Sequence, residues 1–304
     1  VEERFLASLS FEPLELMRST LALWIGPTDW TPGARRPDGW TLDGAADLPL
    51  AAFLLGACLC LWRSTTGSGR RADRADLACG AALLGSATLA KNEGLALAAI
   101  TLAVLGASEL LRRWWRSSGD DGRRASIAES FAALGLFALV VGPWLAIRGA
   151  IPSIDEDYPR AIAAILGLGE PPVGAGETNL TPTTLGGALA RVPVVLGGFA
   201  YSFAHLLRWN LTWPLFLVVL LWWSVRRPLA LARHPVLPLV AITLGAVVAY
   251  GAILVVTPWD LAALYGTTIP GRLVLHVAPL AILCTFSLAW TTEAERRGTP
   301  PTAE

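Results

Sequence analysis

The sequence predicts an all-α fold, a polytopic membrane helix bundle, on three observations. Hydrophobic residues make up 54% of the 304 residues and charged residues only 16%, and the mean hydropathy is +0.52. Apolar runs recur along the chain, and several approach the roughly 20 residues that a helix needs to cross about 30 Å of hydrocarbon. Arginines gather in the short connections between these runs. We therefore expect one integral membrane domain with about seven transmembrane helices.

The expected helices follow from the length of the apolar runs and from the absence of charge within them. They are Leu48–Trp62, Leu77–Ala90, Gly94–Leu111, Ile127–Ile147, Leu211–Val225, Pro235–Val256 and Leu273–Trp290. The predicted organisation is an outer-side N-terminal segment over residues 1–47, an integral domain over residues 48–290, and a cytoplasmic tail over residues 291–304.

The orientation follows from arginine, because basic residues near the ends of spans are kept on the cytoplasmic side. Four places carry them: Arg63, Arg70, Arg71 and Arg74; Arg112, Arg113, Arg116, Arg123 and Arg124; Arg226, Arg227 and Arg233; Arg296 and Arg297. If all four face the cytoplasm, the turn Lys91–Gly94 lies on the outer side. Asp47, the loop 148–210 and residues 257–272 then lie outside as well.

The outer loop 148–210 contains a second apolar stretch whose placement is open. Arg191, Pro193, Gly197, Gly198 and His205 interrupt it, which favours a helix lying in the membrane interface over a span across 192–207. The same loop begins with an acidic run, Asp155, Glu156 and Asp157. This run is interpreted as a solvated loop, with contact to an acceptor or a metal as the alternative.

The remaining composition excludes several classes of function. The formal net charge is zero, so nothing indicates binding to nucleic acid. The four cysteines, Cys58, Cys60, Cys79 and Cys284, lie inside apolar runs without the spacing of a metal site. They are interpreted as small buried hydrophobic residues.

Lys91 is the only lysine in the chain, and it interrupts an apolar stretch together with Asn92 and Glu93. The preceding run of 14 residues, Leu77–Ala90, extends only about 21 Å as a helix, so Lys91 and Glu93 are expected near headgroup depth. Ionisable groups at that depth indicate a functional site. The alternative is a hairpin turn in which Lys91 and Glu93 pair with each other and reach water.

Two further charges support the functional interpretation. Asp47 begins the first expected span and Arg272 begins the last, both on the side of Lys91 and Glu93. Two cations and two carboxylates at headgroup depth suit a lipid phosphate, because Arg offers a planar fork and Lys a point charge. The carboxylates would hold a divalent metal or accept a proton from an acceptor hydroxyl.

Two residues near Arg272 are weaker candidates. His276 lies one helical turn beyond Arg272 on the same face, either to hydrogen-bond the phosphate or as a satisfied core histidine. Asp260 is expected to cap a short outer helix, with a catalytic role as the alternative.

The segments ADLPLA, LAKNEGLALA and TPWDLAALYGTTIPGRLVLHVAPL resemble bacterial GT-C-type membrane glycosyltransferases of the protein O-mannosyltransferase and aminoarabinose-transferase clan. The resemblance covers about residues 45–290. It implies a multi-pass protein of the bacterial inner membrane that transfers a sugar from a polyprenyl-phosphate donor to a glycan, lipid or protein acceptor on the outer face.

The resemblance also implies roles for the charged residues. Lys91 and Arg272, with His276, would bind the donor phosphate, and Asp47 and Glu93 would be catalytic, positioning metal, donor or acceptor. The sugar, the acceptor and the use of a metal are not specified.

One element of the family is missing from the sequence. Family members carry an acidic motif in the first outer loop, after an N-terminal span, and nothing in residues 1–44 matches it. The chain is therefore expected to be the C-terminal portion of a longer enzyme, which Val1 in place of Met favours, or to have lost sugar transfer. A transporter and a noncatalytic lipid-binding membrane subunit are the alternative functions.

Overall fold

The computed structural model describes residues 47–66, 70–90, 93–115, 120–150, 158–169, 184–204, 211–256 and 268–296. Within these ranges the secondary structure is helical and contains no strand, so the all-α class is confirmed there. The helices are α3 (Asp47–Thr66), α4 (Arg70–Ala90), α5 (Glu93–Trp115), α6 (Asp120–Ala150), α7 (Tyr158–Ile165), α8 (Leu185–Ala204), α10 (Thr212–Arg226), α11 (Pro228–Arg233), α12 (Leu237–Val256), α14 (Thr268–Leu275) and α15 (Ala278–Arg296).

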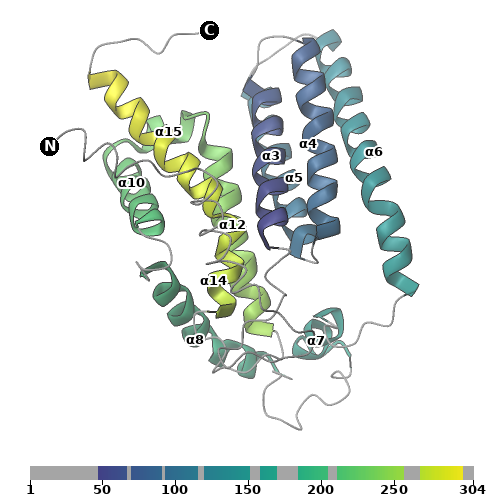
Figure 1. Ribbon diagram of the computed structural model, residues 1–304, viewed down its shortest axis with the longest axis vertical. Coiled ribbons are helices and arrows are strands. Elements are labelled where there is room, and N and C mark those ends of the chain that lie inside the picture. The colour runs from purple at the N-terminus through teal and green to yellow at the C-terminus, as the bar shows by residue number, and fades with distance from the viewer. Residues whose placement is uncertain are drawn as a thin grey trace, which may run out of the picture.

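The long helices run up and down through the bundle (Figure 1). Helices α3, α4, α5 and α6 form one group, in which α4 packs against α3, α5 and α6. Helix α12 joins this group to the rest, because it contacts α5 on one side and α8, α14 and α15 on the other. Helix α14 also contacts α3 and α8, so the start of the last helical region meets the start of the first.

Four helical stretches are long and apolar enough to cross a membrane: Asp47–Ser64, Glu93–Leu111, Leu185–Ala204 and Leu237–Val256. Three shorter apolar stretches accompany them: Phe131–Ile147, Thr212–Arg226 and Ala278–Thr291. These four candidate spans support a multi-pass membrane protein. Because α8 is among them, the stretch expected at the interface meets the requirements for a span. The number of seven spans and the interfacial placement stay predictions.

The last expected span, Leu273–Trp290, is not one continuous helix. Helix α14 ends at Leu275 and α15 begins at Ala278, with a turn at His276 and Val277 between them. Pro279 explains the break, because proline has no N–H to donate and its ring clashes with the carbonyl four residues earlier. Through the turn, the N–H groups of His276 and Val277 bond three residues back, to Leu273 and Val274, at 3.3 Å.

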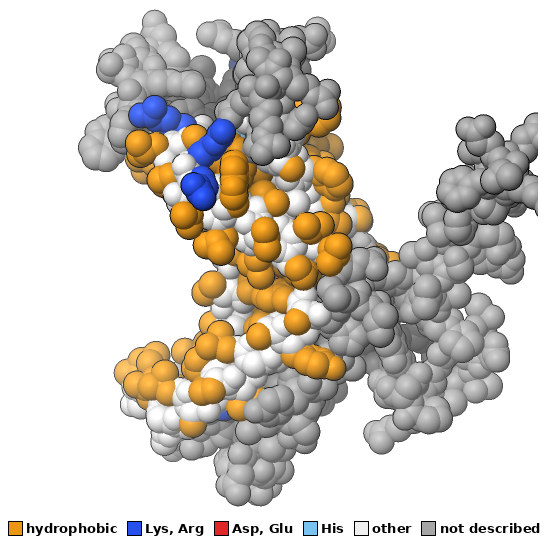
Figure 2. All heavy atoms as spheres, turned by 90° about the vertical axis from the view of Figure 1, so that its left-hand side faces the viewer, with side chains coloured by type: hydrophobic (Ala, Val, Ile, Leu, Met, Phe, Trp, Pro, Cys, Tyr) orange, Lys and Arg blue, Asp and Glu red, His pale blue; other side chains and the backbone are white. Residues whose placement is uncertain are grey.

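The surface of the bundle is rich in exposed hydrophobic side chains. Examples from five helices are Leu110, Phe131, Val218, Val248 and Phe286, each more than 60% exposed. On the face in Figure 2, hydrophobic side chains form a broad band, and arginine side chains gather at its upper end. A wide apolar exterior is unusual for a water-soluble monomer and is what a helix bundle in lipid requires.

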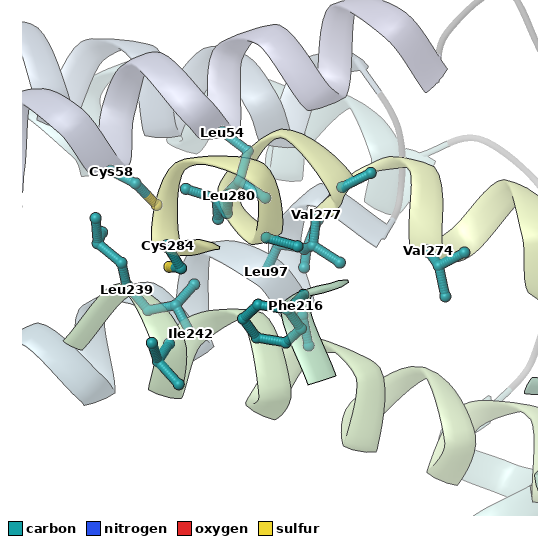
Figure 3. Packing of buried hydrophobic residues seen from close by; sticks show 14 of the residues in the cluster. Leu54, Cys58, Leu97, Phe216, Leu239, Ile242, Val274, Val277, Leu280 and Cys284 are labelled. Carbon is teal, nitrogen blue, oxygen red and sulfur yellow. The ribbon is translucent and has the colours of Figure 1, made fainter. Parts of the chain in front are cut away.

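The core lies where α3, α5, α12 and α15 meet (Figure 3). Cys58 and Cys284 are buried in it, as the sequence predicted. The prediction of burial is wrong for Cys79, which is exposed, and Cys60 is only partly buried. Cys60 lies on α3 and Cys79 on α4, and both are outside the central cluster, toward the arginine-bearing ends of these helices.

Candidate functional site

Asp47 begins α3 and is the centre of the site. Its carboxylate lies in the first turn of the helix, where the partial positive charge of the helix N-terminus favours an anion. The side chain is only 2% exposed. A buried carboxylate must be paired or hydrogen-bonded to stay charged, and each of the two Asp47 oxygens has a hydrogen-bond partner.

Arg272 is the first of these partners. Its Nε donates to Oδ2 of Asp47 at 2.9 Å. Arg272 lies in α14, which contacts α3, so two residues 225 positions apart meet. The Arg272 side chain is 31% exposed, and its guanidinium carries four N–H donors besides Nε. The cation therefore reaches the surface while the anion that holds it does not.

His276 is the second partner and is completely enclosed. Its Nε2 lies 2.9 Å from Oδ1 of Asp47, and its Nδ1 lies 2.8 Å from the hydroxyl of Tyr250. Arg272 and His276 thus share one face, as their spacing predicted. With both ring nitrogens engaged, His276 is a satisfied core histidine, and the geometry gives it a positioning role in place of phosphate contact.

The partners assign the protons within this chain of hydrogen bonds. A carboxylate only accepts, so the His276 Nε2–H donates to Asp47. The other ring nitrogen, Nδ1, is hydrogen-bonded to the Tyr250 hydroxyl. Asp47 and Arg272 balance each other's charge, and both carboxylate oxygens and both ring nitrogens have hydrogen-bond partners, which a low-dielectric setting requires.

Tyr250 was not singled out in the sequence. It is the only ionisable residue in α12, a 20-residue stretch of mean hydropathy 2.5, and polar groups deep in such a stretch indicate a partner inside the bundle. Its ring also packs edge-on against His276, with centroids 5.8 Å apart. A single tyrosine within this apolar stretch was therefore the feature of the sequence that could have indicated the site.

Glu93 begins α5 at the same end of the bundle as Asp47. It is close enough to Tyr250 for a carboxylate and a phenol to interact electrostatically. Lys91 lies outside the described residues, as do Asp155, Glu156, Asp157, His205 and Asp260. The structure therefore brings together Asp47, Arg272 and His276, with Glu93 nearby.

Gly94 fixes the approach of α5 to α4. A Cβ atom there would collide with the carbonyl group of Ala87 and with the Cα of Thr88. Only glycine permits this contact between the end of α4 and the start of α5. The backbone on either side of Lys91 is thus tightly packed at the end of the bundle that holds Asp47.

Arg191 adds a further buried cation in this half of the molecule. It lies on α8 and is 5% exposed, and α8 packs against both α12 and α14. In the sequence analysis Arg191 counted only against a membrane span in this region. Its burial shows that the arginine faces other helices of the bundle, where an ionisable residue of a span is expected to lie.

The described residues contain no group of three or more His, Cys, Asp and Glu side chains that could hold a metal ion. Asp47 already accepts hydrogen bonds from Arg272 and His276. The arrangement is best suited to binding an anion at Arg272, because the buried Asp47 carboxylate holds the partly exposed guanidinium in place.

Comparisons of the chain with protein-family models, with curated proteins and with solved structures gave no match.

Proposed function

We propose that this protein is a GT-C-like membrane glycosyltransferase that binds a polyprenyl-phosphate sugar and passes the sugar to an acceptor on the outer face of the bacterial inner membrane. The observation that carries the proposal is the Asp47–Arg272 pair, in which a buried carboxylate holds a partly exposed guanidinium. Such a guanidinium is preorganised, so little entropy is lost when it binds phosphate.

The position of the pair along the bundle supports a lipid substrate. Arg272, Asp47 and Glu93 belong to one end of the bundle, and the arginine-bearing ends of α3, α10 and α15 belong to the other (Figure 1). A lipid phosphate lies at headgroup depth while its chain stays in hydrocarbon. A cation at the end of apolar helices meets that charge without drawing it into the membrane interior.

The proposed roles depend on which side chains a substrate can reach. Arg272 and Lys91 stabilise the negative charge that builds on the phosphate as the sugar leaves. Glu93 accepts the proton of the acceptor hydroxyl or holds a divalent metal. Asp47 was expected to be catalytic, but its burial favours positioning of Arg272 over contact with the acceptor.

The proposal includes seven spans, with the arginine-bearing ends in the cytoplasm and the Asp47 end outside.

The test is binding of polyprenyl phosphate and of polyprenyl-phosphate sugar to the full chain in nanodiscs. Arg272→Gln and Lys91→Met are expected to weaken binding about tenfold or more each, whereas Arg227→Gln at the opposite end is the matched control and is expected to bind as wild type. Equal binding by all four proteins would overturn the donor-site assignment. Uptake of a solute without any requirement for the lipid would instead identify a transporter.

A further inference from the structure

Cys60 and Cys79 face each other across the closest helix pair in the bundle. Helices α3 and α4 run antiparallel, and Arg63 on α3 pairs with Asp76 on α4 at 3.4 Å. Three residues back along α3 and three forward along α4, Cys60 stands opposite Cys79. The two thiols are near enough to interact electrostatically.

Neighbouring contacts fix this register independently of the thiols. A Cβ on Gly80 would lie 2.6 Å from Leu61 and 3.2 Å from the carbonyl oxygen of Ala57, so the two backbones approach closely beside the cysteines. One turn further, Gly56 meets Leu83 in the same way. The ion pair on one side and the glycine contacts on the other hold the thiols in place.

The pair is accessible and lies near charge. Cys79 is exposed and Cys60 partly buried, whereas Cys58 and Cys284 are enclosed in the core (Figure 3). The site lies about one helical turn from the Arg63–Asp76 pair, and both members of the pair interact electrostatically with Cys60. Because Cys79 is exposed, a metal ion or an alkylating reagent can reach this pair, whereas it cannot reach the enclosed thiols of Cys58 and Cys284.

We propose that Cys60 and Cys79 form a two-thiolate binding site for a soft, two-coordinate metal ion, of which Cu(I) is the type. Thiolate sulfur selects soft ions. A two-coordinate ion separates its ligands by about two metal–sulfur bonds, on the order of 4 Å, which suits two thiols that stand opposite each other on closely packed helices. Two described cysteines without a third cysteine or histidine beside them do not form the four-ligand shell of structural zinc.

Charge and compartment are consistent with this ion. Binding releases the two thiol protons, and two thiolates with one Cu(I) carry a single negative charge, while the neighbouring Arg63 and Asp76 offset each other. In the proposed orientation the pair lies toward the cytoplasm, where thiols stay reduced. A metal-bound dithiol is therefore favoured over a disulfide, and only this step depends on the proposed function.

The test is an anaerobic titration of the purified full chain with Cu(I) in the presence of a chromogenic Cu(I) chelator. The wild type is expected to withdraw one Cu(I) per chain, and Cys60→Ala and Cys79→Ala are each expected to lose this binding. The matched control is the double variant Cys58→Ala/Cys284→Ala, which removes the two core thiols and is expected to bind as wild type. Equal uptake by the wild type and a Cys60→Ala/Cys79→Ala variant would overturn the proposal.

A second measurement needs no variant. Alkylation of the wild-type chain, followed site by site by mass spectrometry, is expected to be at least tenfold slower at both Cys60 and Cys79 with Cu(I) bound. Unchanged alkylation rates at these two positions would overturn the site even if a variant failed to fold. Neither readout involves polyprenyl phosphate, so the outcome is independent of the glycosyltransferase proposal.

Discussion

The Nε atom of Arg272 lies 2.9 Å from Oδ2 of Asp47, which joins the beginning of the last helical region to the beginning of the first. The carboxylate is enclosed and the guanidinium partly exposed. The pair therefore serves two purposes that can be measured separately: it closes the bundle, and it presents a cation at one end.

Asp47→Asn tests the first purpose. The amide keeps the shape of the side chain but removes the charge that Arg272 and His276 face, so we expect the free energy of unfolding to fall by about 2 to 3 kcal/mol. The measurement is thermal or denaturant unfolding in detergent. Asp76→Asn in the Arg63–Asp76 pair, whose arginine is 68% exposed, is the control and is expected to cost less than about 1 kcal/mol. Equal losses of unfolding free energy in the two variants would mean that the burial of Asp47 does not increase the contribution of its ion pair to stability.

Arg272→Lys tests the second purpose. Lysine keeps the charge, but its single ammonium cannot hold Asp47 through one nitrogen and offer a planar fork with others. We expect polyprenyl phosphate to bind about tenfold more weakly, or about 1.4 kcal/mol. The matched change at the opposite end is Arg227→Lys, where the guanidinium stacks over Trp222 and Trp223 and affinity should not change. Wild-type affinity for Arg272→Lys would show that charge alone suffices.

Tyr250→Phe removes the hydroxyl from Nδ1 of His276 and leaves that nitrogen without its bond in an enclosed site. We expect a loss of about 1 to 2 kcal/mol in unfolding free energy. The readout is the unfolding midpoint, with Tyr201→Phe as the control because Tyr201 is exposed on α8. If the two variants matched in stability, the bond to His276 would be energetically neutral.

The sequence predicted the helices well because their signal is local. Each expected run overlaps an observed helix, although Leu211 precedes α10 and Pro235 and Val236 precede α12. The last run is divided between two helices, where Pro279 was visible but was not weighed against the apolar run. That Arg272 and His276 contact the same carboxylate was partly predictable, because a spacing of four residues places two side chains on one face of a helix. Their common partner, Asp47, was not predictable from this spacing.

Tyr250 and the cysteine pair were not predicted because they depend on the register between helices. Register is decided by contacts such as Gly80 with Leu61, which periodicity along one helix does not encode. Cys79 was expected inside because its neighbours are apolar, but in lipid the outer face of a helix is apolar too, so hydrophobicity does not separate buried from exposed positions.

Two exposed leucines test the orientation. Leu229 on α11 and Leu168 after α7 are 73% and 78% exposed and belong to opposite ends of the bundle. In a background without native cysteines, Leu168→Cys is expected to react with an impermeant maleimide in intact cells. Leu229→Cys is expected to react only after permeabilisation, because arginine-rich ends face the cytoplasm. The reverse pattern would put the Asp47 end in the cytoplasm and exclude an outer-leaflet substrate.

Gly94→Ala tests whether the hairpin between α4 and α5 supports the site. The added Cβ would meet backbone atoms of Ala87 and Thr88, which cannot rotate away as a side chain can, so the helices must separate. Overpacking of this kind costs about 1 to 3 kcal/mol, and we expect both the unfolding midpoint and the affinity for polyprenyl phosphate to fall, because Glu93 begins the displaced helix and Lys91 precedes it by two positions in the sequence. Gly106→Ala in the same helix is the control, since nothing lies within 4 Å of its added Cβ, and alanine there should stabilise the helix by up to about 1 kcal/mol. A loss of stability in Gly94→Ala with unchanged affinity would separate the hairpin from the phosphate site and leave Arg272 as its described cation.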